Sequence, residues 1–366
     1  MLQLLTEVTL GLAPQEGAKD LLLAGGRIEL IAPAKDPALR ALPAARAECS
    51  GLLAFPALID QHVHITGAGG EQGFASRTEE IPAQEIFAAG VGTVVGLLGT
   101  DAVTRSMENL FARSKALEEQ GLSVYLYSGS YAVPPVTLTG SVERDLILIG
   151  RVLGAGEIAI SDHRSSQPTA RELLDLAAQV HRGALLAGKA GVLHLHVGDG
   201  PGGLAPLRAL LQSDLPIEEF VPTHLNRSRR LFGEAVEYGR RGGNVDLTAG
   251  ESRGVPVPEA VERLMAGGVP MSRVTVSSDA GGSVPGGGVS RIGALLEDLR
   301  GCVARGIPPE RAFALAGEHA ARVLGLYPRK GALLPGSDAD ILFTDAAFRV
   351  KRLFCKGVLR FGAPPA

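Results

Sequence analysis

Short runs of apolar and β-branched residues recur roughly every 30 residues from residue 58 onward, and most of the intervals have the spacing of an amphipathic helix, as in TRSMENLFARSKALEEQ. Eight runs are predicted to be strands: 58–65, 91–98, 124–129, 157–161, 192–197, 218–224, 243–248 and 274–279. Eight strand-helix units in one chain fit a (β/α)8 barrel of the α/β class better than a doubly wound sheet, which usually has fewer strands.

Metal-ligand side chains fall late in these runs. They are His62, His64, His196, His224 and Asp279. Because barrels of this kind place their chemistry at the carboxyl ends of the strands, we expect the five side chains to converge at one mouth. His62 and His64 are two residues apart on one strand, so both imidazoles point to the same side, and such a cluster suits a divalent transition metal such as zinc.

The two ends of the chain have a different pattern. Residues 1–55 and 331–366 contain short strands separated by turns, without clustered polar residues. We therefore expect a small β-sandwich domain formed from both termini, with the barrel occupying residues 56–330. The expected role of the small domain is packing or assembly.

Composition excludes several classes of protein. The net charge of −3, from 36 basic and 39 acidic residues without long runs of one sign, argues against a nucleic-acid partner. No apolar stretch is long enough to span a membrane, and no basic segment precedes an apolar run at the N-terminus. Three widely spaced cysteines favour neither disulfides nor a cysteine-ligated zinc. We expect a cytoplasmic protein with no membrane partner.

Seven motifs occur in the order and approximate spacing of a known family: DQHVHITGAGGE, VGLLGTD, SGSYAVPP, AISDHRS, HVGD, PTHLNR and SSDAGGS. On these motifs the chain resembles the amidohydrolase superfamily and, within it, the isoaspartyl (β-aspartyl) dipeptidases. The likeness covers essentially the whole chain. It implies metal-dependent hydrolysis of β-aspartyl dipeptides, a small-molecule dipeptide as substrate, and a homo-oligomer such as an octamer.

The resemblance also assigns a site with two divalent metal ions, expected to be zinc. It implies that His62, His64 and Asp279 hold one ion, that His196 and His224 hold the other, and that Asp279 is the general base. Such a site fits the chemistry, because bound metal lowers the pKa of water enough to generate a hydroxide near neutral pH. A carboxylate beside that metal-bound hydroxide can pass its proton to the leaving amine.

Substrate contacts follow from the same resemblance. Tyr131 is expected to polarise the scissile carbonyl. Gly69, Gly70 and Glu71 are expected to bind the α-ammonium group, with Thr100 beside them. Arg164, Arg227 and Ser283 are expected to receive the substrate carboxylates, for which the guanidinium group is well shaped. Two further histidines, His163 and His194, are expected to lie outside the set of direct ligands.

One position departs from the family pattern. These dipeptidases commonly bridge their metals with a carboxylated lysine on the fourth strand, where this chain has Glu157, and no lysine occurs between Lys115 and Lys189. Glutamate offers the same terminal carboxylate, which is an ordinary zinc ligand. It is shorter, so the strand or the metals must shift by roughly 3 to 4 Å for it to bridge. We expect Glu157 to be the bridging ligand.

Two alternatives remain open on the sequence alone. The same site could act on a cyclic amide or an N-acyl amino acid, although two arginines and Glu71 favour a zwitterionic ligand. The protein could instead be a catalytically weak binding protein whose metal site is impaired by Glu157. Metal content and substrate preference separate these hypotheses.

Overall fold

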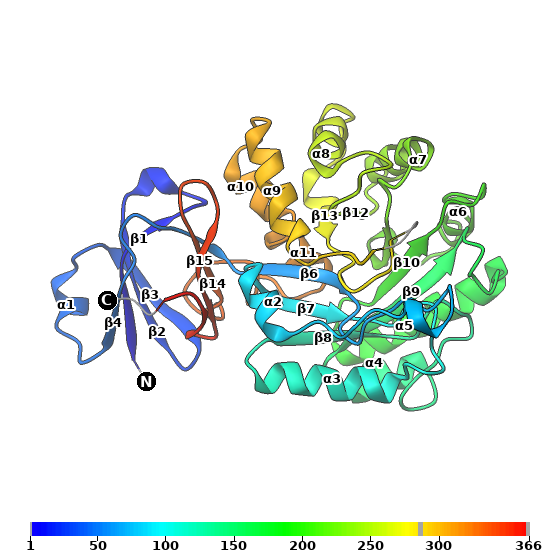
Figure 1. Cartoon of the computed structure of the whole chain (residues 1–366), viewed down its shortest axis with the longest axis horizontal. Coiled ribbons are helices and arrows are strands. Elements are labelled where there is room, and N and C mark those ends of the chain that lie inside the picture. Colours follow the sequence, from blue (N-terminus) through cyan, green and yellow to red (C-terminus); the bar gives the residue numbers. More distant parts are fainter. Residues whose placement is uncertain (1, 285–287, 364–366) are drawn as a thin grey trace.

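The computed structural model describes residues 2–284 and 288–363, and its larger part is a barrel of eight parallel strands (Figure 1). The strands are β6 Leu58–Val63, β7 Val91–Gly96, β8 Ser123–Ser128, β9 Val152–Ile160, β10 Val192–Val197, β11 Phe220–Thr223, β12 Val245–Thr248 and β13 Val274–Ser277. The expected (β/α)8 class is thereby confirmed. The sixth strand begins two residues later than predicted, because Ile217–Glu219 form a 3-10 turn instead of extended chain.

Two sheet segments make up the barrel. Strands β6 to β11 pair in sequence order, and β12 pairs with β13. A bridge between Val63 and Ala280 joins the first strand to the end of the last, and the amide of Leu225 donates to the carbonyl of Asp246 at 3.2 Å. The ring is therefore closed on both sides of the shorter segment.

A buried carboxylate connects four strands inside the barrel. The side chain of Asp246, on β12, is fully buried and accepts four hydrogen bonds of 2.6 to 2.7 Å. Its donors are Gln61, Thr223, Thr275 and Ser277. A carboxylate satisfied in this way stabilises the interior instead of destabilising it, and it forms a rigid floor below the polar mouth.

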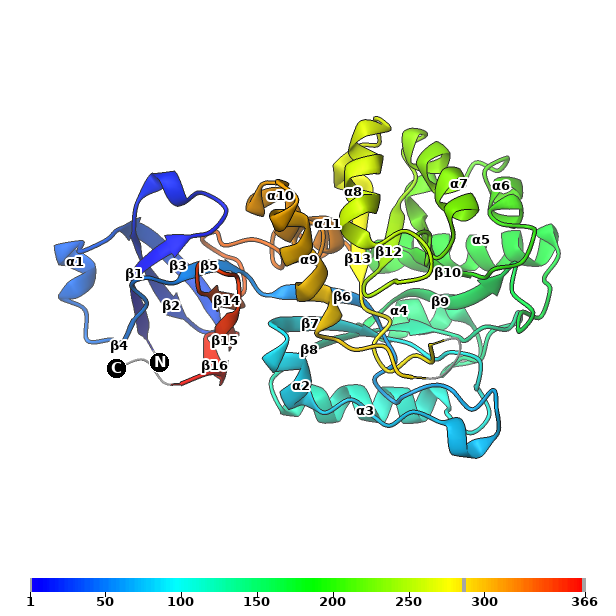
Figure 2. The same cartoon turned by 45° about the horizontal axis from the view of Figure 1, so that its top comes forward.

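Helices cover the outside of the barrel, one after each strand (Figure 2). They are α2 Ala83–Ala88, α3 Met107–Glu119, α4 Val142–Leu148, α5 Ala170–Ala187, α6 Ala205–Leu210, α7 Arg229–Arg240, α8 Val257–Ala266 and α9 Ala294–Ala304, followed by α10 Pro309–Ala314 and α11 Glu318–Val323. In α5 a capping box of Thr169 and Glu172 starts the helix and Gly188, in the left-handed conformation, ends it. Within the described part of the chain, no helix is long and apolar enough to cross a membrane.

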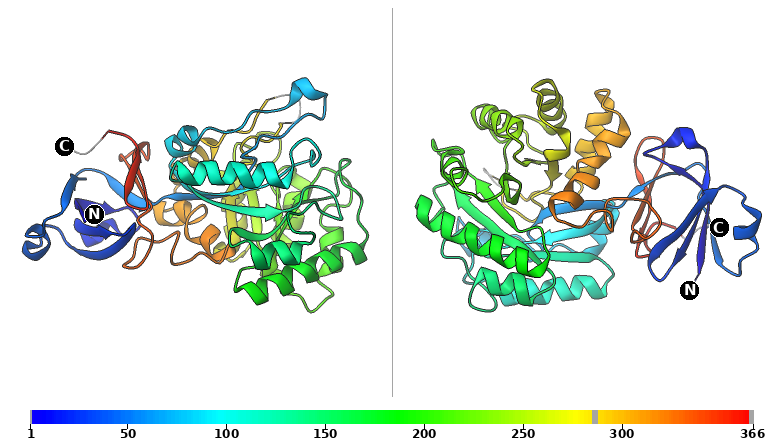
Figure 3. Two further views of the ribbon diagram at one scale, coloured as in Figure 1. Left: turned by 90° about the horizontal axis from the view of Figure 1, so that it is seen from below. Right: turned by 180° about the vertical axis from the view of Figure 1, so that it is seen from behind.

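Strands from both ends of the chain share one further sheet, which lies beside the barrel in Figure 1. They are β1 Gln3–Leu10, β2 Lys19–Ala24, β3 Arg27–Pro33, β4 Ala45–Glu48, β5 Leu53–Pro56, β14 Ile341–Thr344, β15 Val350–Cys355 and β16 Val358–Phe361. The first half of β1 pairs with β2 and β4 and its second half with β5. Leu5, Leu21, Ile341 and Phe354 belong to one apolar core, so the two halves of this sheet face each other as in a sandwich. The first and the last strands of the described chain, β1 and β16, both lie in this part of the molecule (Figure 3).

Candidate active site

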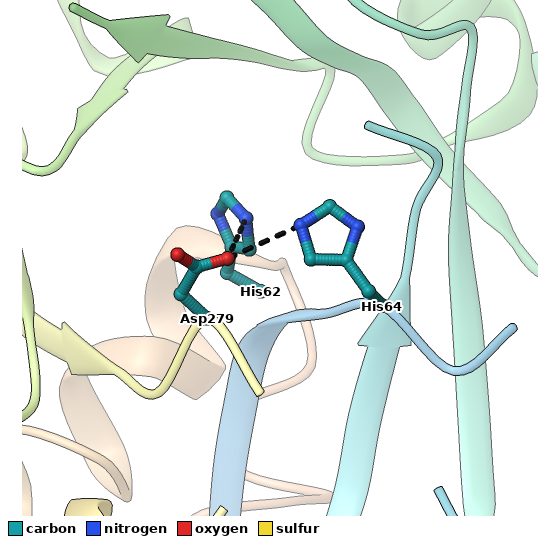
Figure 4. Close-up of side chains that lie close together, drawn as sticks. All are labelled: His62, His64 and Asp279. Carbon is teal, nitrogen blue, oxygen red and sulfur yellow. Dashed lines mark ion pairs between the residues drawn. The ribbon is translucent and has the colours of Figure 1, made fainter. Parts of the chain in front are cut away.

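Three metal-ligand side chains meet at the mouth of the barrel: His62 of β6, His64 directly after that strand, and Asp279 after β13 (Figure 4). Asp279 Oδ1 lies 3.3 Å from His62 Nε2 and 3.1 Å from His64 Nε2. Both imidazoles are buried, and the side chain of Asp279 is mostly buried. The spacing of two residues predicted that both imidazoles point to the same side, and both rings indeed face the carboxylate of Asp279.

Glu157 of β9 lies at the centre of the histidine cluster. Its carboxylate oxygens are 3.5 Å from His62 Nε2, 3.4 Å from His64 Nε2, 2.9 Å from His196 Nδ1 and 3.6 Å from His224 Nε2. One buried carboxylate therefore contacts all four imidazoles that the sequence brought into consideration. The side chain of Glu157 is shorter than a carboxylated lysine, and it still reaches all four histidines.

A β-bulge in β9 positions Glu157. Leu193 of β10 pairs with Ala155, whereas Leu195 pairs with Ile158, so two residues of β10 face three residues of β9. A bulge adds one residue to a strand, bends it and redirects a side chain, and such irregularities are frequent beside active sites. The register shift falls where the chain must bring a glutamate into the centre of the barrel mouth.

His196 of β10 is held between two carboxylates. Its Nδ1 lies 2.9 Å from Glu157 Oε2 and 3.0 Å from the hydroxyl of Tyr131, while its Nε2 lies 3.0 Å from Asp162 Oδ2. Asp162 is a polar residue of the site that the sequence analysis did not select. The available signal was its position two residues before Arg164 in the motif SDHRS.

Two other ring nitrogens have partners that orient their imidazoles. His62 Nδ1 lies 2.8 Å from His194 Nε2, and His224 Nδ1 lies 2.7 Å from the hydroxyl of Thr248. In each ring the opposite nitrogen, Nε2, then faces the carboxylates, as is usual for metal-ligating histidines whose second nitrogen is hydrogen-bonded. His194 thus lies below the ligand cluster, and His163 is exposed outside it.

Two residues of the cluster adopt backbone conformations that side chains disfavour. His224 has φ of 62° and Asp279 has φ of 55°, both just after the ends of their strands. Left-handed backbone in residues other than glycine costs on the order of 1 kcal/mol and is concentrated at functional sites. The barrel holds these two side chains at the mouth despite that cost.

The donor set fits divalent metal ions. His62, His64 and Asp279 form one group with ligand atoms close enough to share an ion, and His62, Glu157 and His224 form a second. His62 Nε2 is buried and has no hydrogen-bond partner among the described residues, although the carboxylates of Glu157 and Asp279 lie nearby. Buried imidazole nitrogens facing carboxylate oxygens are the ligands that zinc and similar ions prefer. His196 lies beside the second group, where it contacts the carboxylates of Glu157 and Asp162.

Burial and charge set the protonation of the polar groups. Burial raises the pKa of the Tyr131 phenol well above its usual value, so this group stays neutral and can donate a hydrogen bond. Burial acts to raise the pKa of Asp279, but the neighbouring imidazoles of His62 and His64 outweigh it and lower that pKa. Burial, helped by the positive charge of Arg227, lowers the pKa of His224 to about 3. A neutral imidazole is the form that binds metal.

Three polar side chains gather around Glu71 at the outer part of the mouth. Glu71 Oε1 accepts hydrogen bonds from the Thr100 hydroxyl at 3.2 Å and from Arg164 Nη1 at 3.1 Å, and the Ser283 hydroxyl is 3.4 Å from both carboxylate oxygens. The guanidinium of Arg164 also lies over the ring of Tyr131, 5.1 Å from its centroid. Ser283 therefore sits with Glu71, whereas the sequence analysis grouped it with the arginines.

The remaining expected residues border this group. Arg227 Nη1 donates to the carbonyl of Val197 at 2.9 Å and lies 3.3 Å from His196 Nε2. Gly69 and Gly70, with φ of 72° and 98°, form the turn that leads to Glu71. At Gly69 a β-carbon would lie 2.6 Å from the carbonyl oxygen of Ser76, so this turn requires glycine.

Comparisons with known proteins agree on one family. The sequence model of the amidohydrolase family matches residues 53–360. A crystal structure of β-aspartyl dipeptidase from the thermophilic, keratin-degrading Fervidobacterium islandicum AW-1 is 38% identical, covers 99% of this chain and 97% of that chain, and has a TM-score of 0.93. A second structure of that protein, in complex with the β-Asp-Leu dipeptide, has a TM-score of 0.94 over 99% of this chain and 96% of that one.

A more distant relative extends the comparison. Imidazolonepropionase of Chromobacterium violaceum is 26% identical over 92% of this chain and 88% of its own length. The family match spans both the barrel and parts of the terminal sheet. The chain, with its metal-ligand cluster at the mouth of the barrel, belongs to the amidohydrolase family.

Proposed function

We propose that this amidohydrolase cleaves β-aspartyl dipeptides, and the observation that carries the proposal is the pairing of Glu71 with Arg164 beside the metal-ligand cluster. An acidic and a basic side chain fixed next to each other match the two charges of an amino-acid head group. A neighbour at 38% identity that is called a β-aspartyl dipeptidase, and was crystallised with β-Asp-Leu, supports the choice of substrate.

Metal ions have a defined place in this proposal. One divalent ion would be held by His62, His64 and Asp279, and a second by His196 and His224. The carboxylate of Glu157 would lie between the two ions. Zinc is the ion that these ligand types favour. Bound there, the metal would supply Lewis acidity and a lowered pKa for water. The contacts of Glu157 with all four histidines support its place between the two ions.

No lysine replaces Glu157 from elsewhere in the barrel. The ammonium group of Lys189 donates instead to the carbonyls of Leu146, Ile149 and Val152, around the end of α4 and the start of β9. Burial lowers the pKa of this lysine, and it serves as a cap for backbone oxygens. These contacts support Glu157 as the carboxylate that holds both ions together.

Asp279 and Tyr131 would act on the scissile bond. Asp279 Oδ1 contacts His62 and His64, which leaves Oδ2 to take a proton from the attacking water and deliver it to the leaving amine nitrogen. The neutral phenol of Tyr131 would donate to the carbonyl oxygen as negative charge develops there. The lowered pKa of Asp279 keeps its carboxylate ionised, which is the state that a base needs before it takes a proton.

The outer side chains would fix the substrate's ends. Glu71, with Thr100 and the Gly69–Gly70 turn beside it, would bind the α-ammonium group, and Ser283 would contribute its hydroxyl there or to a substrate carboxylate. Arg164 and Arg227 would bind carboxylates, since both guanidinium groups lie next to His196. Fixing both ends holds the amide bond near Asp279.

Three broader properties complete the proposal. Residues 1–55 with 331–366 would form one domain and 56–330 the other, as the shared terminal sheet supports. The described part of the chain has three free, buried cysteines, which suits a cytoplasmic protein. A homo-oligomer such as an octamer is supported by the exposed leucines of α4 and α5, Leu148, Leu185 and Leu186.

An assay with zinc-loaded protein tests the proposed activity. We expect turnover of isoAsp-Leu, no turnover of the isomer Asp-Leu, and loss of activity on removal of metal with a chelator. Cleavage of a cyclic amide or an N-acyl amino acid with no action on isoAsp-Leu would reject the dipeptidase assignment. Absence of bound metal after reconstitution would favour the alternative of a weak binding protein.

A further inference from the structure

Asp162, in the loop after β9, contacts both groups of functional residues. Its Oδ1 accepts hydrogen bonds from the backbone amide of Arg164 at 2.8 Å and from Arg164 Nε at 2.9 Å. Its Oδ2 lies 2.9 Å from Arg164 Nη2 and 3.0 Å from His196 Nε2. One carboxylate therefore contacts a candidate metal ligand and a candidate substrate-binding residue together.

Two carboxylates on opposite sides of His196 fix the direction of its ring. Nε2 lies 3.0 Å from Asp162 Oδ2, and Nδ1 lies 2.9 Å from Glu157 Oε2, on the side of the ligand cluster. In metal-ligating histidines, a hydrogen-bond partner at one ring nitrogen orients the other nitrogen toward the metal. Asp162 thereby holds the ring so that Nδ1 faces the candidate metal site.

The same carboxylate fixes the direction of Arg164. Its two oxygens engage Nε and Nη2 of the guanidinium fork, which leaves Nη1 pointing to Glu71 at the outer mouth. Such a two-point contact restricts a long side chain to one orientation. Arg164 therefore presents its remaining N–H groups where a substrate carboxylate would arrive.

The fold holds Asp162 tightly. The residue is buried, its backbone carbonyl accepts a hydrogen bond from the Gln167 side chain at 2.7 Å, and its β-carbon lies against Gly198 of the next loop. A β-carbon added at Gly198 would come within 2.5 Å of that of Asp162, so the approach needs glycine. The position of this carboxylate is thus set from two neighbouring strand ends.

We propose that Asp162 is a positioning residue that fixes the ring of His196 for metal and the orientation of Arg164 for substrate, and so links metal binding to substrate binding. The proposal rests on the proposed function for its substrate half. Its metal half depends only on His196 as a ligand.

Asp162→Asn tests both halves. An amide offers one accepting oxygen and one donating NH2, so either His196 or Arg164 loses its acceptor. We expect the zinc dissociation constant of the weaker site, measured by competition with a chromophoric chelator, to rise about 10- to 100-fold, and KM for isoAsp-Leu to rise as well. Asp175→Asn, in an exposed ion pair on α5, is the matched control and should change neither. A lower melting temperature with unchanged zinc affinity and KM would overturn the proposal.

Arg164→Met separates the two links. This variant should raise KM and keep zinc affinity near that of the wild type, and the double variant Asp162→Asn/Arg164→Met should have the KM of Arg164→Met alone. Additive effects on KM would overturn the link through Arg164. If the protein does not cleave isoAsp-Leu at all, the zinc measurements still decide the metal half.

A structure of the zinc-loaded wild-type protein keeps the proposal testable if the Asn variant does not fold. His196 should bind zinc through Nδ1, with Nε2 hydrogen-bonded to Asp162. Ligation of zinc through Nε2 would overturn the proposal.

Discussion

The guanidinium of Arg164 and the carboxylate of Glu71 form an ion pair across the barrel mouth, with Arg164 Nη1 3.1 Å from Glu71 Oε1. The side chains keep 22% and 27% of their surface exposed, and ion pairs in contact with water contribute only about 0 to 1 kcal/mol to stability. The charges of Glu71 and Arg164 are complementary to the ammonium and carboxylate groups of an amino-acid zwitterion. On substrate binding, the α-ammonium group would take the place of Arg164 beside Glu71, and a carboxylate would take the place of Glu71 beside Arg164.

Glu71→Gln should weaken substrate binding. The variant keeps the shape of the side chain but loses the charge that would face the α-ammonium group, and hydrogen bonds to charged groups contribute about 1.5 to 3 kcal/mol. We expect kcat/KM for isoAsp-Leu to fall about 10- to 100-fold, mainly through KM, in steady-state kinetics. Glu119→Gln, on the exposed side of α3, should leave the kinetics unchanged. Wild-type kinetics in Glu71→Gln would point to a substrate without an ammonium group.

Glu157→Gln should reduce the metal content. The wild-type protein reconstituted with zinc should contain two equivalents per chain, whereas a neutral amide in contact with four imidazoles loses the charge that holds two cations together. Elemental analysis after dialysis should find less than two equivalents, with activity lost in proportion or more. Glu85→Gln, on the exposed surface of α2, serves as the control. Two full equivalents in Glu157→Gln would show that Glu157 does not bridge.

The barrel could be predicted from the sequence because its strands are buried on both faces. Runs such as 192–197 are then almost continuously apolar apart from the residues at the mouth, and helical patterns separate them. The convergence of His62, His64 and Asp279 followed from the same rule, since strand ends meet at one face. These features depend on periodicity, which a single sequence contains.

Features that depend on register or loop conformation could not be predicted. The sequence placed Glu157 on the fourth strand, but its reach depends on the bulge opposite Leu193 and Leu195. Asp162 was missed because its partner His196 is 34 residues away and the contact depends on the path of a loop. The contact between Ser283 and Glu71, which are 212 residues apart in the sequence, likewise depends on the path of the chain after β13.

Lys330→Met should destabilise the protein at the junction of the two parts of the molecule. Lys330 is buried, and its ammonium group contacts Asp338 at 2.9 Å, Asp340 and the Ser123 hydroxyl at 2.7 Å. Burial acts to lower the pKa of this lysine, but the charges of Asp340 and Asp338 outweigh it and raise that pKa. Removing the cation leaves Asp340 without its ion-pair partner and Asp338 with Arg329 alone, at a cost of about 3 to 5 kcal/mol.

Urea unfolding measures the effect of Lys330→Met. The control is Lys115→Met, which removes an exposed ion pair with Glu118 and should change the free energy of unfolding by about 1 kcal/mol or less. Equal stability of Lys330→Met and the wild type would show that this buried cluster is neutral to stability. Lys330 contacts Ser123 at the start of β8, at the end of the strand away from the mouth, so KM should be unchanged in the variant.

Asp20 should make the stability of the terminal sheet depend on pH. Its buried carboxylate accepts hydrogen bonds from Arg40 and from the amides of Glu7 and Lys35, whose φ values of 56° and 68° mark two tight bends. Burial acts to raise the pKa of Asp20, but the hydrogen bonds and the charge of Arg40 outweigh it and hold the pKa below its usual 3.8. Because the folded state has the lower pKa, the stabilisation is complete above the unfolded pKa and is lost as pH falls through the folded one.

Asp20→Asn tests this dependence. At pH 6 the variant should be less stable than the wild type by about 1.5 to 3 kcal/mol, because the amide cannot replace a charged acceptor of several hydrogen bonds. The difference in the free energy of unfolding should shrink as pH falls from 6 to 3, since the wild-type carboxylate becomes protonated while the amide does not titrate. Asp175→Asn, in an exposed pair with Arg171, should differ little from the wild type at either pH. A difference for Asp20→Asn that stays constant over this range would show that the carboxyl does not carry the pH dependence.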